Sequence, residues 1–166
     1  MSNAIRQLLL AAIAAVCVGV LIGSRNEPTA IAMTAHGTAK KSMATVPLES
    51  GLEAVVTLDH VSGDLTGYVL NRINGQFFIR YRYNVSQQFP MHSGNYLIAA
   101  GLANFRGFRD NDRIANGVIY VSEETSQRVV AYALPWNPSF ATSTAKPREL
   151  SFVALDQAQT RFTAVR

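Results

Sequence analysis

Past residue 51, the apolar residues of this chain recur in short alternating runs, and no stretch has a sustained helical period. A period of two is the pattern of a strand that buries one face. Between Gln76 and Tyr83 the alternation predicts Phe77, Ile79, Tyr81 and Tyr83 on one face and Phe78, Arg80 and Arg82 on the other. These roughly 115 residues predict one all-β domain, a small β-sandwich or a barrel-like sheet.

Eight strands are expected in this domain, separated by turn-forming residues. The expected strands are Ala54 to Leu58, Leu65 to Asn71, Gln76 to Tyr83, Tyr96 to Leu102, Gly117 to Ser122, Gln127 to Leu134, Glu149 to Leu155 and Arg161 to Val165. The segment Asp59 to Asp64 has the Asp, Ser and Gly of a tight turn. Asn74-Gly75 predicts a type I′ hairpin turn, because both residues accept a positive φ.

Two of the expected hairpins have similar sequences. Residues 54–70, AVVTLDHVSGDLTGYVL, align without a gap with residues 118–134, VIYVSEETSQRVVAYAL. The identical pairs are Ser62 and Ser126, Tyr68 and Tyr132, and Leu70 and Leu134. One interpretation is a duplicated β-meander whose halves pack together. The alternative is that any two half-buried hairpins share alternating Val, Tyr and Leu.

An uninterrupted apolar run from Leu8 to Gly23 precedes the domain, between Arg6 and Arg25. As an α-helix it would span roughly 24 Å, slightly less than the ~30 Å of a hydrocarbon core. The Ala-x-Ala pattern at residues 30–32 lies well past the run, whereas signal peptidase sites normally follow the apolar core closely. We expect residues 1–25 to be an uncleaved membrane anchor; the alternative is a cleaved signal that releases a soluble exported domain.

Residues 26–51 are rich in Ala, Thr, Ser, Lys and Gly, contain Pro28 and Pro47, and have no apolar period. Such a composition predicts a flexible linker. The expected organisation is therefore an anchor (1–25), a linker (26–51) and the all-β domain (52–166). A short tail before the anchor favours a single-pass membrane protein with its N-terminus inside and the β domain on the extracytoplasmic side.

Composition argues against several classes of function. After residue 24 the net charge is about +3 and the basic residues are scattered, which predicts no nucleic-acid groove. The only cysteine, Cys17, lies in the apolar run, so the domain has no disulfide, thiolate metal site or cysteine nucleophile. No phosphate-binding glycine loop and no Gly-x-Ser-x-Gly elbow is present. We therefore predict no catalytic residue, metal or cofactor.

One turn is the exception that an enzyme or a small-ligand sensor would use. Asp59, His60 and Asp64 lie close together in sequence, and a carboxylate beside a histidine orients the ring as a base or a ligand. The same residue types also satisfy the backbone of a tight turn, and no second histidine is near.

Asp110-Asn111-Asp112 lacks the glycine and the distal glutamate of a calcium loop.

Aromatic and basic residues supply a candidate contact surface. Two phenylalanines lie in the polar loop after the strand that ends near Leu102, and three arginines accompany them. The candidate residues are Phe105, Arg106, Phe108, Arg109 and Arg113. Exposed, they would be anchors for a protein partner or for self-association, since aromatic residues and Arg are enriched at binding hot spots. Folded back, the phenylalanines would cap the core, which is their commoner place.

Four segments carry a resemblance to known proteins. They are LDHVSGDLTGYVLN (58–71), INGQFFIRYRYN (73–84), NYLIAAGLANFRG (95–107) and VVAYALPWN (129–137). This part of the chain resembles an uncharacterised group of small, N-terminally anchored proteins of planctomycete-type bacteria with no known activity. The resemblance implies a protein of the bacterial cell envelope and assigns no site residue.

The sequence therefore predicts a membrane-tethered all-β module that acts by binding or assembly in the cell envelope. An exported enzyme or small-ligand sensor that uses the Asp59-His60-Asp64 turn is one alternative. An accessory scaffold subunit of a larger membrane complex is another. An enzyme should show a polar pocket with convergent titratable groups, whereas an assembly module should show an exposed aromatic patch or an open sheet edge.

Overall fold

The computed structural model describes residues 35–49, 51–89, 94–105, 113–142 and 147–161. The expected anchor (1–25) lies outside these residues. Within them, no helix has the length and apolar character needed to cross a bilayer. The described part is all-β, as predicted, and its only helices are two short 3-10 turns, η1 (Val85–Gln87) and η3 (Pro138–Thr142).

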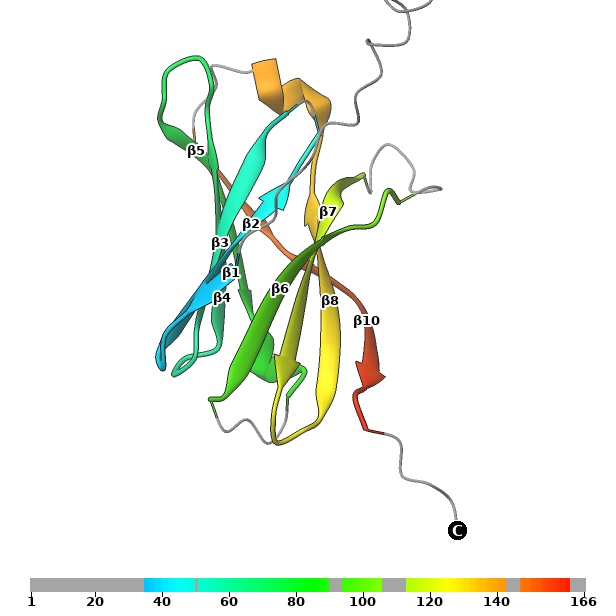
Figure 1. The fold of residues 1–166 in the computed structure, drawn as a ribbon. Helices are drawn as coiled ribbons and strands as arrows, with labels where there is room; N and C mark the ends of the chain where they lie inside the picture. Colours follow the sequence, from blue (N-terminus) through cyan, green and yellow to red (C-terminus); the bar gives the residue numbers. More distant parts are fainter. Residues whose placement is uncertain (1–34, 50, 90–93, 106–112, 143–146, 162–166) are drawn as a thin grey trace, which may run out of the picture. The chain divides into compact units, whose positions relative to one another are not determined.

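Within these described ranges, ten strands form two sheets, which lie side by side in Figure 1. The strands are β1 (Ala35–Gly37), β2 (Lys41–Pro47), β3 (Glu53–Asp59), β4 (Asp64–Leu70), β5 (Phe77–Asn84), β6 (Tyr96–Leu102), β7 (Ile114–Glu123), β8 (Arg128–Pro135), β9 (Arg148–Ser151) and β10 (Val153–Gln159). Sheet A has the order β1-β2-β3-β4-β5-β9, and sheet B has the order β10-β8-β7-β6. Each sheet thus contains a four-stranded antiparallel meander, β2 to β5 in sheet A and β6, β7, β8 and β10 in sheet B.

The two sheets share one hydrophobic core. Alternate residues of the strands point into it, for example Val56 and Leu58 from β3 and Ile119 and Val121 from β7, all fully buried. Burial of aliphatic side chains of this size contributes about 1.5–3 kcal/mol each, so this interior is the main source of the fold's stability. The prediction that alternating apolar residues face the core is therefore confirmed, and one face of each sheet lies in the core.

Tyrosines of both sheets link the two layers through this core. The hydroxyl of the buried Tyr81, on β5, donates to the carbonyl of Pro135 at the end of β8, at 2.7 Å. From β8, the Tyr132 ring packs against Tyr83 of β5 with 5.3 Å between centroids. The amide of Gln88, just after η1, donates to the Tyr83 hydroxyl at 2.6 Å. Burial raises the pKa of the Tyr81 and Tyr132 hydroxyls, so both stay neutral donors.

The last two strands form one stretch of chain that changes sheet. The sequence predicts a single strand from Glu149 to Leu155, but the structure divides it at Phe152. The residues before Phe152 form β9, which pairs in parallel with β5 of sheet A, and those after it form β10, which pairs with β8 of sheet B. Phe152 itself is only 2% exposed and lies in the shared core.

The predicted linker is wrong for residues 35–37 and 41–47, which form β1 and β2 of sheet A. Ala44 and Val46 are buried in the core, and β2 pairs with β3 along its whole length. The sequence of β2, KSMATVP, alternates small inward residues, Ser42, Ala44 and Val46, with the outward Lys41, Met43 and Thr45. Small residues give a weak hydrophobic signal, which is why this strand has the composition of a linker.

The predicted facing of β5 is also wrong at its start. Phe77 is 58% exposed, whereas Phe78 is buried together with Ile79. The cause is an irregularity in the pairing of β4 and β5: Leu70 is opposite Phe77, but Val69 is opposite Ile79, so Phe78 has no partner on β4. Such a β-bulge reverses the facing of the residues beyond it.

Because β2 supplies core residues and pairs with β3, we predict that residues 32–166 fold alone and residues 52–166 do not. Both fragments should be compared by far-UV circular dichroism and urea unfolding. The longer one should give a β spectrum and a cooperative transition. A native-like, equally stable domain from residues 52–166 would show that β2 is dispensable and would restore the predicted linker boundary.

Candidate functional site

Three hairpin turns, which include the predicted Asp59-His60-Asp64 turn, have the same backbone structure. In each, the amide of the fourth loop residue donates to the carbonyl of the residue before the loop: Gly63 to Asp59 at 2.9 Å, Gly75 to Asn71 at 2.8 Å, and Gln127 to Glu123 at 3.1 Å. The fourth residues have positive φ, of 73°, 69° and 52°. The predicted type I′ turn at Asn74-Gly75 is therefore wrong, since the loop has four residues and only Gly75 among them has a positive φ.

In all three turns the side chain before the loop accepts backbone amides of the loop. Asp59 Oδ1 accepts from residues 61 and 62 at 2.9 and 3.1 Å, and Asn71 Oδ1 accepts from residue 73 at 2.8 Å. The buried Glu123 accepts from residues 125 and 126 through its two carboxylate oxygens. The β4–β5 turn lies outside the aligned repeat and has the same scheme, so this likeness follows from hairpin geometry.

The acidic residues of the predicted turn are thus occupied with structural roles. The amides of Ser62 and Val61 lower the pKa of Asp59, because they donate to its ionised form; Lys41, 3.8 Å away, adds to this effect. Asp64 accepts from the hydroxyl of Ser62 at 2.8 Å and from the side-chain amide of Asn84 at 3.0 Å. Neither carboxylate has a hydrogen bond to His60 among the described contacts.

His60 points away from these carboxylates and into the protein. It is 8% exposed, and its Nε2 lies 2.7 Å from the hydroxyl of Ser42, on β2. Its ring lies 6.0 Å from that of Tyr96, at the start of β6. Within the described residues no three His, Cys, Asp or Glu side chains lie close enough together to hold a metal ion. The structure does not bring Asp59, His60 and Asp64 together as a site.

The predicted contact surface lies mainly outside the described residues, which do not include Arg106, Phe108 and Arg109. Phe105, just after β6, is half-buried. Arg113, just before β7, forms an ion pair with Glu49 at 3.0 Å, and its carbonyl accepts the amide of Trp136 at 2.9 Å. Arg113 thus connects the start of β7 to the β2–β3 loop and to the residue that follows β8. Whether the loop between Phe105 and Arg113 binds a partner stays a prediction.

An aromatic and basic surface that the sequence analysis does not single out lies over β4 and β5. We name it the β4–β5 surface and define it by Tyr68, Leu70, Phe77 and Arg80. Phe77 is 58% exposed and Leu70 is 46% exposed, and the two are opposite each other in the pairing of the strands. The rings of Tyr68 and Phe77 lie 5.6 Å apart at an angle of 57°. The bulge at Phe78 is what places Phe77 on this outer face.

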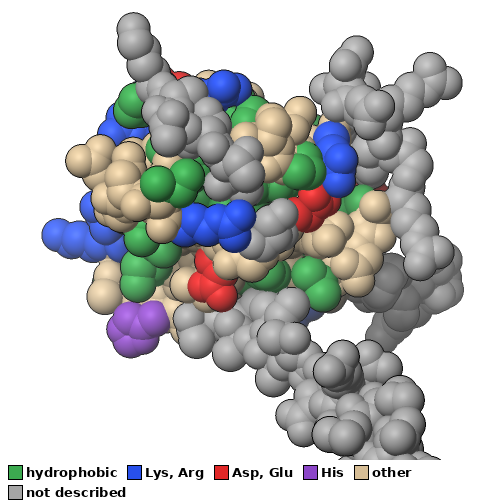
Figure 2. Space-filling view, turned by 90° about the horizontal axis from the view of Figure 1, so that it is seen from above, with side chains coloured by type: hydrophobic (Ala, Val, Ile, Leu, Met, Phe, Trp, Pro, Cys, Tyr) green, Lys and Arg blue, Asp and Glu red, His purple; other side chains and the backbone are tan. Residues whose placement is uncertain are grey.

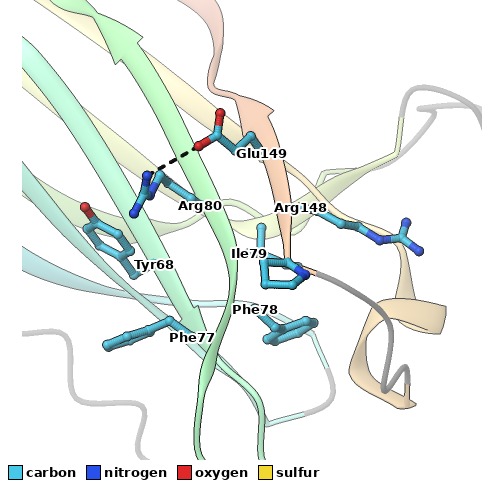
Figure 3. Close-up of a pocket in the computed structure, with 8 residues that line it drawn as sticks. Tyr68, Phe77, Phe78, Ile79, Arg80, Arg148 and Glu149 are labelled. Carbon is cyan, nitrogen blue, oxygen red and sulfur yellow. Dashed lines mark hydrogen bonds and ion pairs between the residues drawn. The ribbon is translucent and has the colours of Figure 1, made fainter.

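A cavity of about 370 Å³ opens beside this surface, where β5 extends beyond β9. Figure 3 shows its lining, with Arg80 and Glu149 joined above Phe77 and Phe78. The residues that line it are Tyr68, Phe77, Phe78, Ile79, Arg80, Pro147, Arg148 and Glu149. Its volume is within the range of small binding pockets, which are mostly apolar with a few charged groups.

Charged groups around the cavity are held in defined positions. The Arg80 guanidinium lies 5.5 Å from the centre of the Tyr68 ring and forms an ion pair with Glu149 at 3.3 Å. The guanidinium of Arg148, which is exposed, lies 4.8 Å from the ring centre of Phe140, on η3. Both arginines thus rest on aromatic rings, Arg80 on that of Tyr68 and Arg148 on that of Phe140. Their two positive charges exceed the one negative charge of Glu149.

On the face of the molecule in Figure 2, Lys and Arg side chains are interspersed with acidic and apolar ones. Comparison with protein-family models, with curated proteins and with solved structures finds no match to this chain.

The lowered pKa of Asp59 generates a prediction on acid stability. Its ionised form stabilises the fold above the carboxyl's unfolded pKa, and this contribution is lost as pH falls through the lowered folded pKa. Asp59→Asn keeps the Oδ1 acceptor and removes the titration. Urea midpoints of residues 32–166 at pH 7 and pH 2.5 should therefore differ less in this variant than in the parent domain. An unchanged pH dependence would assign the acid sensitivity to other carboxylates.

Proposed function

We propose that this chain is a binding module of the bacterial cell envelope, held at a membrane by residues 1–25, which binds a protein partner through the β4–β5 surface. The observation that carries the proposal is the exposure of Phe77, which is 58% accessible beside the ring of Tyr68, over which the Arg80 guanidinium lies. The apolar run at Leu8 to Gly23 and the resemblance to anchored envelope proteins support the location.

The residue types of the β4–β5 surface are those that anchor protein interfaces. Aromatic residues and Arg are enriched at hot spots, where a few side chains carry most of the binding free energy. Burial of the exposed part of Phe77 would contribute about 1–2 kcal/mol to association. The Tyr68 ring and Leu70 extend the apolar contact, so a partner can cover a continuous patch.

The cavity and its charges suggest what the partner presents. An apolar side chain fits the cavity, which Phe77 and Phe78 both line, and a neighbouring carboxylate fits Arg148, which has no ion pair among the described contacts. Arg80 is already neutralised by Glu149 at 3.3 Å, so Arg148 supplies the net positive charge. We infer a protein segment that carries an acidic residue next to an apolar one.

An enzyme or sensor built on the Asp59-His60-Asp64 turn receives less support. Its carboxylates accept hydrogen bonds from the turn, and His60 is bonded to Ser42. The scaffold alternative differs from a binding module only in the size of the assembly, and the β4–β5 surface serves both.

We predict that the photoreactive amino acid p-benzoylphenylalanine at position 77 of the full chain cross-links one discrete partner in native membranes. The analogue preserves the aromatic ring, and illumination followed by mass spectrometry identifies the adduct. Val153, an exposed apolar residue (43%) on β10 of sheet B, is the matched control position. A second substitution, Arg148→Glu, should reduce the adduct at position 77 at least several-fold.

The opposite outcomes are equally specific. The proposal is wrong if position 77 gives no adduct, or if positions 77 and 153 capture the same set of proteins. An adduct that Arg148→Glu leaves unchanged would remove the acidic group from the description of the partner.

A further inference from the structure

Within the described residues the two sheets have four edge strands, β1, β9, β10 and β6, and β9 and β10 have features that discourage pairing with another chain. β9 has four residues, two of them charged, Arg148 and Glu149. β10 carries Asp156 and an irregularity in its register between Ala154 and Asp156. Short length, charge and bulges are the usual means by which proteins protect sheet edges.

The fourth edge, β6, has none of these features. Its sequence is YLIAAGL, seven residues without a charge or a proline. It pairs with β7 in unbroken register from Tyr96 to Leu102, and it has no second strand partner within the described residues. Leu97 is 75% exposed, the most exposed of the large apolar residues on the strands. A regular, uncharged edge of this kind is a template for strand addition.

The outward side chains of β6 are arranged to fit a second copy of the same strand. Leu97, Ala99 and Gly101 alternate with the inward residues of β6, and Ala99 is the central residue of the strand. In an antiparallel pair related by a two-fold axis at Ala99, each Leu97 is opposite Gly101 of the second copy. Leu97, the largest outward side chain of β6, thus lies opposite Gly101, which has no side chain, on both sides of the axis.

The surroundings of Gly101 also suit a leucine from a second copy. A Cβ at Gly101 would lie 2.8 Å from the ring of Tyr120 and 3.2 Å from Val118, so this ring covers the glycine. Leu97 of the second copy would pack beside the Tyr120 ring. The β7 residues opposite the outward side chains of β6 are Ser122, Tyr120 and Val118, so the pairing brings no like charges together.

We propose that β6 is a self-association edge, through which two copies of this chain join antiparallel about Ala99 and form one sheet from their two B sheets. The interaction is isologous, because the same residues are supplied by both copies. It involves sheet B and does not depend on the proposed function of the β4–β5 surface on sheet A, which stays free in the dimer.

Disulfide trapping in the full chain tests the pairing. Cys17→Ser removes the only native cysteine, and Ala99→Cys then places one thiol at the proposed two-fold axis. Paired residues on antiparallel strands have Cα atoms about 4.5–5.5 Å apart, which a disulfide can bridge. Membranes that contain this variant should give a disulfide-linked dimer on mild oxidation with copper phenanthroline.

The matched control is Ala158→Cys, in the same background. Ala158 is also exposed, on the same face of sheet B but on the opposite edge strand, β10. The Ala99→Cys variant should form the dimer at least ten-fold faster than this control. Adding Leu97→Lys to the Ala99→Cys variant should abolish this difference in dimer rate, because it places a charge on the β6 edge. Adding Val153→Lys, on β10, should leave the difference unchanged.

Melting temperatures of the substituted chains must stay close to the parent value, which the exposure of Leu97 (75%) and Val153 (43%) predicts. Equal dimer rates for the two cysteine variants would overturn the proposal, as would a mixed disulfide between Ala99→Cys and a different protein in place of the dimer. Cross-linking at position 77 uses sheet A, so a negative result there leaves this test unaffected.

Discussion

The packing of Phe152 between the two sheets is the contact on which the rest of this structure depends. The chain leaves sheet A and enters sheet B at this residue. Phe152 is only 2% exposed at the point of crossing. The ring lies 5.5 Å from that of Tyr81, and a Cβ at Gly67 would come within 2.9 Å of it. Gly67 on β4 thus provides the space that Phe152 fills, and any larger residue there would push the ring out.

This one contact has consequences for both layers and for the proposed binding surface. Phe152 abuts Tyr81, whose hydroxyl reaches Pro135 in sheet B. It also fixes β9 beside β5, and through this pairing Glu149 lies opposite Arg80, far away in sequence. The ion pair of these residues holds the guanidinium above Tyr68. The geometry of the β4–β5 surface therefore follows from the crossing of the last strands.

The sequence predicts the all-β class and most of the strands because alternation is a local signal. β6 and the two aligned hairpins are found where the pattern places them. The errors occur where non-local packing decides. Small residues hide β2 from a sequence-based prediction, since Ala44 and Val46 are buried in the core but each buries little apolar area. The division of the last strand at Phe152 is set by contact with Gly67 and Tyr81, about 70 to 85 residues earlier.

The candidate surface was harder to predict than the fold. Strict alternation predicts an inward Phe77, and only the run Phe77-Phe78-Ile79 indicates that the alternation breaks. Three consecutive apolar residues in a half-buried strand are a signal of a bulge, but they do not say which phenylalanine turns outward. The Asp59-His60-Asp64 turn shows the reverse: residues typical of a catalytic site satisfy a hairpin backbone, because Asp and Gly serve both purposes.

The most direct test of this account is the effect of Phe152→Ala on the urea unfolding of residues 32–166. The account predicts a loss of about 3–5 kcal/mol in the free energy of unfolding, as for a buried aromatic residue replaced by Ala, with a single transition monitored from both sheets. Val153→Ala, at the next and 43% exposed position, should cost much less. A loss below about 1 kcal/mol for Phe152→Ala, or separate transitions of the two sheets in the parent domain, would contradict the central place given to this residue.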